Sequence, residues 1–225
     1  METQYDWRWS THQPLHKLLL EEFRPQFIME LGAGMYSTPL FIDHNPQKFI
    51  CIENDKKWLD MIVNKLNPRK EYDMIFDDLG PDIDLGTFRK NISKDKLNEI
   101  IDYYVKVCED VITYSIYPKL LFVDNFTCCR SAAVNNLSKG FDIITYHDCQ
   151  PAGISWYEYY FESYLKNEFS HYYMKTPNSW TGAFVSLGLD YNESELISRS
   201  VDFADKYRVE NGLPKGSVYL VKEDI

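Results

Sequence analysis

The sequence predicts a single α/β domain built on a Rossmann-like, doubly wound parallel sheet. Two observations predict this fold class. Short apolar segments alternate with amphipathic segments along the chain, and residues 120–124 form an apolar run ending in aspartate, as is typical of a central strand in a parallel sheet. No stretch resembles a linker, so we expect one domain over residues 1–225, with residues 1–12 as an N-terminal arm.

In the first half of the chain, proline-containing turns separate the expected elements. Pro14 suits the first turn of a helix, and Arg24-Pro25 ends that helix. Asn45-Pro46 and Asn67-Pro68 end the next two. We therefore expect helix 14–23, strand 27–31, helix 37–44, strand 48–53, helix 56–66 and strand 72–76, followed by a loop over residues 82–93.

The second half continues the alternation and ends in two neighbouring strands. Residues 94–114 carry apolar side chains at helical spacing, and Gly140 suits the end of a helix. Pro177-Asn178 favours a turn between two strands. We therefore expect helix 94–114, strand 120–124, helix 131–137, strand 141–146, helix 156–165, strands 169–175 and 181–187, and helix 193–208.

Composition narrows the class of protein. A net charge of -10 argues against a general nucleic-acid binder, which needs a basic face against phosphates. No apolar run approaches the ~20 residues that span a bilayer, and the N-terminus lacks the pattern of a signal peptide. Five cysteines without a CxxC spacing indicate reduced thiols. We expect a cytoplasmic protein, in a host cytoplasm if the Asn-, Lys-, Ile- and Tyr-rich composition reflects a viral genome. The sequence leaves the oligomeric state open, with a homodimer as one option.

Polar groups follow most of the expected parallel strands. In such sheets ligands bind at the carboxyl ends of the strands, so these groups should meet along one edge. The strand-end groups are Glu30 to Gly34, Glu53, Asp77-Asp78, Asp124 and His147-Asp148.

The glycine turn after the first strand distinguishes two kinds of cofactor. Gly32 and Gly34 allow a tight turn and close approach to the backbone. A dinucleotide fold needs a third glycine where this chain has Ser37, and Glu30 is a poor neighbour for a pyrophosphate. S-adenosyl-L-methionine (SAM) has no phosphate but carries a sulfonium, an ammonium and a carboxylate. Glu30 suits its cationic end, while Ser37, Thr38 and the helix N-terminus suit its carboxylate.

These residues resemble the class I SAM-dependent methyltransferase family over roughly residues 15–190. Glu30-x-Gly32-x-Gly34 resembles its first motif, Cys51-Ile52-Glu53 its second and Leu121 to Asn125 its fourth, and the two late strands resemble its terminal hairpin. The resemblance implies a mostly parallel sheet with an antiparallel terminal strand. It also implies that Glu30, Gly32 and Gly34 line the methionine part of SAM and that Glu53 holds the ribose hydroxyls. Asp77 or Asp78 would lie beside the adenine, and Asp124 would face the methyl group or the methionine amine.

The acceptor side leaves several mechanisms open. His147 or Asp124 could remove a proton from a hydroxyl acceptor as a general base. Alternatively, Asp124 and Asp148 could bind a divalent cation, Mg²⁺ or Mn²⁺, that lowers the pKa of the acceptor. Metal-dependent O-methyltransferases carry Asp-Asp or Asp-Asn where this chain has His147-Asp148. Arg130 could orient a polar acceptor, and Trp7 and Trp9 could close over the site.

The expected activity is O-methylation of a sugar hydroxyl in a glycan. This expectation rests on a loose resemblance of residues 123–148 to small O-methyltransferases that act on sugars, including glycan-modifying enzymes of large DNA viruses and bacterial polysaccharide pathways. The alternatives are a metal-dependent, catechol-like O-methyltransferase of small molecules, a non-catalytic SAM- or dinucleotide-binding module, and an NAD(P)-dependent dehydrogenase. Aromatic residues after strand five (Trp156, Tyr157, Tyr159 and Tyr160) could stack on an acceptor.

Overall fold

A single mixed sheet organises the chain. The computed structural model describes residues 8, 10–78, 93–112, 115–125, 127–149 and 161–223. In these residues the sheet has eight strands in the order β3-β2-β1-β4-β5-β7-β6-β8. The strands are β1 (Phe27–Leu31), β2 (Lys48–Glu53), β3 (Asp73–Phe76), β4 (Lys119–Val123), β5 (Ile143–His147), β6 (Phe169–Lys175), β7 (Trp180–Ser186) and β8 (Tyr219–Glu223).

The strand directions agree with the predicted fold class. β1 pairs in parallel with both β2 and β4, and β3 and β5 extend this parallel part on either side. β7 is antiparallel to both β5 and β6, so β6 runs in the same direction as β1 to β5. The predicted terminal hairpin is confirmed as β6 and β7. The chain order reverses between β1 and β4, and this reversal is where doubly wound sheets bind ligands.

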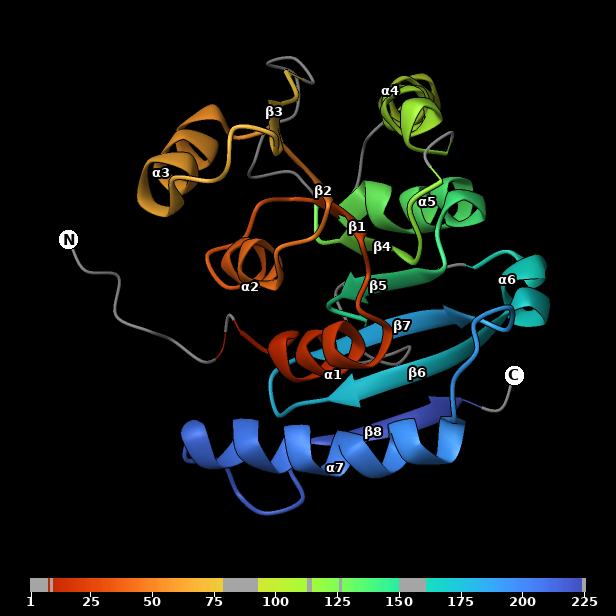
Figure 1. Cartoon of the computed structure of the whole chain (residues 1–225). Coiled ribbons are helices and arrows are strands. Elements are labelled where there is room, and N and C mark those ends of the chain that lie inside the picture. Colours follow the sequence, from red (N-terminus) through yellow and green to blue (C-terminus); the bar gives the residue numbers. More distant parts are fainter. Residues whose placement is uncertain are drawn as a thin grey trace.

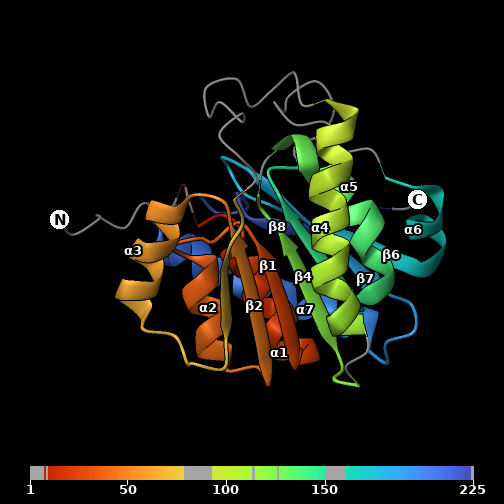
Figure 2. The same ribbon diagram turned by 90° about the horizontal axis from the view of Figure 1, so that it is seen from above.

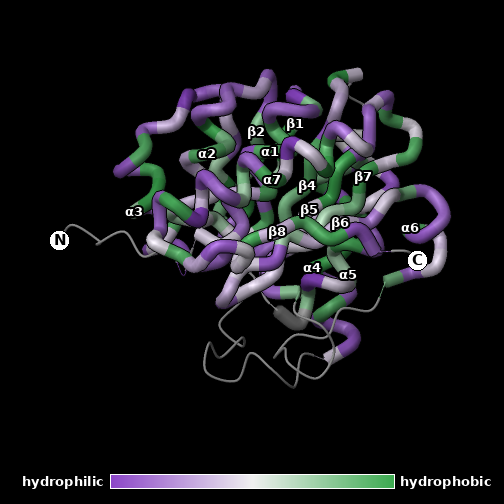
Figure 3. The backbone as a smooth tube through the Cα atoms, turned by 90° about the horizontal axis from the view of Figure 1, so that it is seen from below, coloured by the Kyte–Doolittle hydropathy of each residue, from purple (hydrophilic) through white to green (hydrophobic). Residues whose placement is uncertain are grey.

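Helices cover both faces of the sheet (Figures 1 and 2). One face carries α4 (Lys94–Ile112), α5 (Thr127–Leu137) and α6 (Ser163–Glu168), and the other carries α1 (Gln13–Phe23), α2 (Ser37–His44), α3 (Lys56–Leu66) and α7 (Glu193–Glu210). Each face has its own hydrophobic cluster, and alternate residues of each strand supply the two clusters. Figure 3 shows the hydrophobic central strands enclosed by more hydrophilic segments.

Most expected elements are present, with shifts of one or two residues at several ends, such as β5 at Ile143–His147, and three larger differences. α5 begins at Thr127 rather than at residue 131, because Cys129 and Ala133 are both buried one helical turn apart and extend the packed face of the helix. β8 was not predicted. It is an edge strand with mostly exposed side chains, so it lacks a strong apolar pattern. α6 lies at 163–168, and residues 156–160 of the helix expected there lie outside the described residues.

Two further expectations concern the ends and surface of the molecule. None of the helices in the described part of the chain combines the length and apolarity that a bilayer crossing requires. Ser10, Thr11 and His12, which were expected to belong to an N-terminal arm, are buried. Trp7 and Trp9, the four aromatic residues at 156–160 and most of the expected loop at 82–93 lie outside the described residues.

Candidate functional site

Successive side chains of a strand point to opposite faces of the sheet, and this decides which strand-end groups lie together. Leu31, Val123 and Tyr146 face the cluster under α4 and α5. Glu30, Asp124 and His147 occupy the alternate positions, so they belong to the opposite side, which α1 and α2 cover. The register pairs Val123 with Tyr146, so Asp124 and His147 are also neighbours along the sheet edge.

Three consecutive backbone N–H groups of the glycine turn donate to the protein itself. Gly32 donates its N–H to the carbonyl of Ile52 at 2.8 Å. Ala33 donates to the Glu53 carboxylate at 2.8 Å, and Gly34 donates to Thr38 Oγ1 at 2.9 Å. Three consecutive amides that could hold a phosphate therefore already have acceptors.

Gly32 is required for a reason that the sequence did not show. Its φ of +90° lies in the left-handed region, and a Cβ there would lie 2.6 Å from the carbonyl oxygen of Asp124. The glycine turn and the end of β4 therefore touch through their backbones. Glycine at this position lets the two halves of the site approach each other.

Glu30 is fully buried beneath this turn. Its Oε2 accepts a hydrogen bond from Thr38 Oγ1 at 2.7 Å, whereas Oε1 has no partner among the described residues. Burial raises the pKa of Glu30 to about 8, although the hydroxyls of Ser37 and Thr38 oppose the shift. The protein thus holds a carboxyl group with one unpaired oxygen next to the turn. A cation bound nearby would favour the ionised form of this group.

Glu53 ties the glycine turn to the end of β2. Besides the N–H of Ala33, it accepts the N–H groups of Asn54 and Asp55 at 2.8 and 2.7 Å. Burial nevertheless raises its pKa, against the effect of these three donors. Trp58 covers the turn and donates from its indole nitrogen to the carbonyl of Ala33 at 2.7 Å. Glu53 therefore supports the turn directly, and its role toward a ribose stays a prediction.

The two aspartates after β3 differ in their surroundings. Asp77 is buried, its Oδ2 has no partner among the described residues, and its backbone N–H donates to the carbonyl of Glu53. Burial raises its pKa to about 6, with further contributions from Asp78 and Glu99. Asp78 is exposed. Asp77 is therefore the better placed of the two for the predicted adenine contact.

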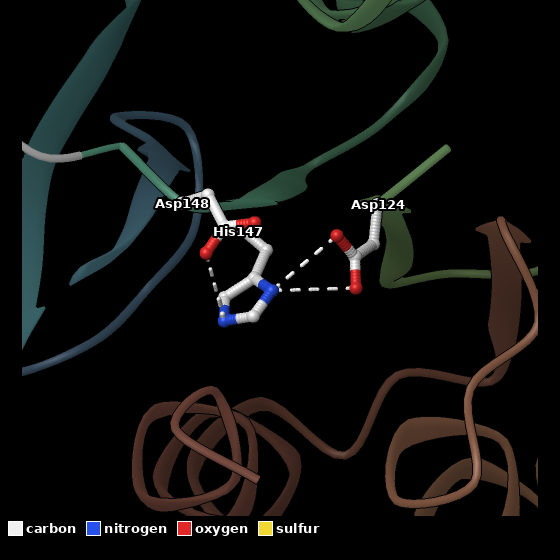
Figure 4. Close-up of side chains that lie close together, drawn as sticks. All are labelled: Asp124, His147 and Asp148. Atoms are coloured by element: carbon white, nitrogen blue, oxygen red, sulfur yellow. Dashed lines mark hydrogen bonds and ion pairs between the residues drawn. The ribbon is translucent and has the colours of Figure 1, made fainter. Parts of the chain in front are cut away.

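Asp124, His147 and Asp148 form the acceptor side of the site (Figure 4). His147 Nδ1 lies 3.3 Å from Asp124, and its Nε2 lies 3.8 Å from Asp148. Burial alone would raise the pKa of Asp124, but His147 and Arg130 hold it below its usual value. Conversely, burial opposes protonation of His147 but the two carboxylates raise its pKa. The Asp124 and Asp148 side chains are 23% and 32% exposed, so both can meet a ligand, whereas His147 is 9% exposed.

Arg130 joins the ends of β4 and β5. Its Nε donates to the carbonyl of Asn125, and its terminal nitrogens donate to the carbonyls of Asp124 and His147 and to Asp148 Oδ2. One terminal nitrogen also forms an ion pair with Asp124 Oδ1 at 2.7 Å. The side chain is only 7% exposed. Orientation of an acceptor by Arg130 was one sequence interpretation, but the structure shows a buried link between two strand ends.

Three residues near the N-terminus belong to the site but were not predicted from the sequence. Thr11 Oγ1 hydrogen-bonds with His147 Nε2 at 2.7 Å. The His12 ring lies 5.1 Å from that of His147 and 5.2 Å from that of His16, and neither nitrogen of His12 has a partner among the described residues. Burial lowers the pKa of His12 to about 3, so its ring is neutral. The only sequence signal was two histidines at the start of an otherwise apolar helix.

The predicted metal ligands can be tested against this geometry. Asp124, His147 and Asp148 each offer one ligand atom, and these atoms lie within 4.8 Å of one another. Arg130, however, already lies on both carboxylates at 2.7 and 3.2 Å. A divalent cation would have to share those oxygens with a buried guanidinium, so the donor set as it stands does not fit a metal.

Comparisons with known proteins do not assign this chain to a family. No protein-family model matches the sequence, and no curated protein matches it either. Among solved structures, a methyltransferase-like protein from Silicibacter pomeroyi is similar with 16% sequence identity and a TM-score of 0.47, over 84% of this chain and 92% of that one. Similarity at this level carries no functional argument, so function has to come from the site.

Proposed function

We propose that this chain is a SAM-dependent methyltransferase that transfers a methyl group to a hydroxyl acceptor. The observation that carries the proposal is that two features lie on neighbouring strands. One is a glycine turn whose N–H groups at Gly32, Ala33 and Gly34 donate to the protein, and the other is the polar group of Asp124, His147 and Asp148. The two parts touch where Gly32 meets the backbone of Asp124. The contact lies between β1 and β4, where the order of the strands in the sheet reverses. Doubly wound folds bind ligands at this position.

The glycine turn favours SAM over a dinucleotide. A pyrophosphate needs free backbone N–H groups, and those of Gly32, Ala33 and Gly34 already donate to the protein. The carboxyl groups of Glu30 and Glu53 border the same turn, and burial raises the pKa of both, so a nearby cation would favour their charged form and a pyrophosphate would oppose it. A cationic ligand gains from both groups. The predicted NAD(P)-dependent alternative is therefore disfavoured.

The acceptor side supports proton removal without a metal. SAM supplies a methyl group bound to a sulfonium, so the C–S bond breaks as a C–O bond forms. The acceptor oxygen becomes positively charged during this change, and its proton becomes acidic enough for a carboxylate to take. Asp124 is a partly exposed carboxylate at the strand end that touches the glycine turn, and we assign it as the group that receives the proton. His147 has both nitrogens engaged and orients Asp124.

We further propose a polyhydroxylated acceptor such as a sugar in a glycan. Asp124 and Asp148 lie side by side and are both partly exposed. Carboxylates accept hydrogen bonds from hydroxyl groups, and two adjacent ones suit neighbouring hydroxyls of one ring. The net charge of -10 does not favour a nucleic-acid acceptor. A catechol-like acceptor is less favoured because that chemistry needs the cation that Arg130 opposes.

Calorimetry and methyl transfer test this proposal together. We expect SAM and S-adenosylhomocysteine to bind while NAD does not. With radiolabelled SAM and a panel of monosaccharides and oligosaccharides, Asp124→Asn should keep SAM binding and lose about 10²–10⁴-fold in transfer rate. Asp102→Asn, on the exposed side of α4, is the matched control and should leave both unchanged. Binding of NAD without SAM would refute the proposal, and SAM binding without transfer to any acceptor would favour a non-catalytic module.

A further inference from the structure

A single buried guanidinium occupies the place where two strand-end carboxylates could share a cation. We infer that Arg130 is a resident cation that substitutes for a divalent metal and positions Asp124 and Asp148, and that its removal converts the Asp124, His147 and Asp148 cluster into a metal site. The positioning role rests on the proposed function. The metal-binding part does not, because it can be measured without SAM or an acceptor.

Four hydrogen bonds and one further ion pair to the described residues surround Arg130. A guanidinium has five N–H donors in a fixed planar fork. Here five acceptors surround it: the carbonyls of Asn125, Asp124 and His147, and one carboxylate oxygen each from Asp124 and Asp148. Because the group is buried and these acceptors hold it, it cannot swing aside for an incoming ion without leaving several donors unpaired.

The carboxylates are also held from their other sides. Ser179 donates to Asp148 Oδ1 at 2.8 Å, and His147 Nδ1 lies against Asp124. Asp148 adopts a left-handed backbone conformation, with φ of +58°. Its carboxylate is thus placed by backbone geometry as well as by Arg130. Removal of the guanidinium would leave most of the ligand arrangement in position.

Charge decides what would then occupy the site. Without Arg130, two partly buried carboxylates would lie next to each other, and within the described part of the chain His147 would be the basic group left between them. Two carboxylate oxygens and an imidazole nitrogen form a ligand set that Mn²⁺ accepts. Asp124 and Asp148 would therefore recruit a divalent ion in place of the missing guanidinium charge.

The experiment measures Mn²⁺ binding to the full-length protein by electron paramagnetic resonance. The wild type should show no site that depends on Asp148. Arg130→Met, which keeps the length of the side chain and removes the charge, should bind Mn²⁺ at least about tenfold more tightly than the wild type. Arg130→Lys, which keeps the charge, should behave as the wild type. Asp148→Asn in the Arg130→Met background should abolish the new site.

Thermal unfolding provides a second measurement. Arg130→Met should be less stable than the wild type, and added Mn²⁺ should raise its melting temperature but not that of Arg130→Lys. Mn²⁺ binding by the wild type that Asp148→Asn removes would overturn the inference. A folded Arg130→Met that binds no Mn²⁺ would also overturn it. If Arg130→Met does not fold, the wild-type and Arg130→Lys measurements still decide whether a metal competes with the resident cation.

Discussion

At the scale of single residues, the two glutamates beside the glycine turn have different energetic roles. Glu53 receives three backbone N–H groups, which favour its charged form and make it a fixed support of the turn. Glu30 accepts a hydrogen bond from the Thr38 hydroxyl, and its second oxygen has no partner among the described residues. Glu30 is therefore the group whose ionisation conflicts with folding.

Replacement of Glu30 tests this conflict. Its pKa is raised from 4.5 to about 8 in the folded state, so its contribution to stability is full below pH 4.5 and is lost as pH rises through 8. Glu30→Gln cannot ionise. The free energy of unfolding of the wild type, relative to Glu30→Gln, should therefore fall by on the order of 3 kcal/mol between pH 5 and pH 8. Urea unfolding at both pH values measures this difference.

The control for this measurement is Glu109→Gln, an exposed glutamate on α4. It should change the unfolding free energy by less than about 0.5 kcal/mol at either pH. If the difference between wild type and Glu30→Gln were the same at pH 5 and pH 8, the carboxyl group would not be protonated in the folded state.

At the scale of elements, β7 shows how one glycine fits a strand to its neighbour. Gly182 pairs with Tyr146 across the antiparallel β5–β7 ladder. A Cβ at Gly182 would lie 2.2 Å from Cζ of the Tyr146 ring, which is fully buried and hydrogen-bonded to His171. The ring cannot move away without losing this bond and its packing. Glycine in the interior of β7 is thus a packing requirement of β5.

We expect Gly182→Ala to destabilise the protein by about 1–3 kcal/mol or more, because the added methyl group overlaps a fixed ring. Gly188→Ala is the matched control, since a Cβ there meets only Ser186 Oγ at 3.5 Å. It should lie within about 0.5 kcal/mol of the wild type. Equilibrium unfolding in urea compares the two. Equal stability of both variants would show that the Tyr146 ring is not held as the structure has it.

The elements also show what the sequence could predict. β1 to β7 and the helices between them were predictable because apolar spacing and proline turns mark their limits, as at Pro25 and Pro46. β8 was not, because its residues are largely exposed and its place depends on pairing with β6. The role of Gly182 was likewise hidden, because it depends on a residue 36 positions away in β5.

At the scale of the whole molecule, the candidate site is closed by segments far apart in the chain. Thr11 contacts His147 over 136 positions, and Ser10 reaches Tyr207 of α7 over 197. The strand-end acids were predictable because parallel strands present their carboxyl ends at one edge. The N-terminal contribution was not predictable, because no local pattern records which segment packs on that edge.

Whole-molecule stability should depend on pH through two opposing groups of buried side chains. Burial lowers the pKa of His12 and His171 to about 3 and that of His16 well below 6.5. The stability that these neutral histidines contribute is fully present above pH 6.5 and is lost as pH falls toward their lowered pKa values. Burial raises the pKa of Glu30 to about 8 and that of Asp77 to about 6, so their contribution grows as pH falls to about 4. The two effects oppose each other between pH 6.5 and 4.5.

Below about pH 4 the carboxyl groups no longer compensate, and only the histidine effect remains. Each histidine that is still neutral in the folded state then costs about 1.4 kcal/mol per pH unit. We expect stability to fall by about 1–3 kcal/mol per pH unit between pH 6.5 and 4, and more steeply below about pH 4, as followed by circular dichroism. His16→Gln, which can still bond to Thr145, should lower the acid midpoint because one proton uptake is removed. An unchanged midpoint in His16→Gln would show that the buried histidines do not govern acid unfolding.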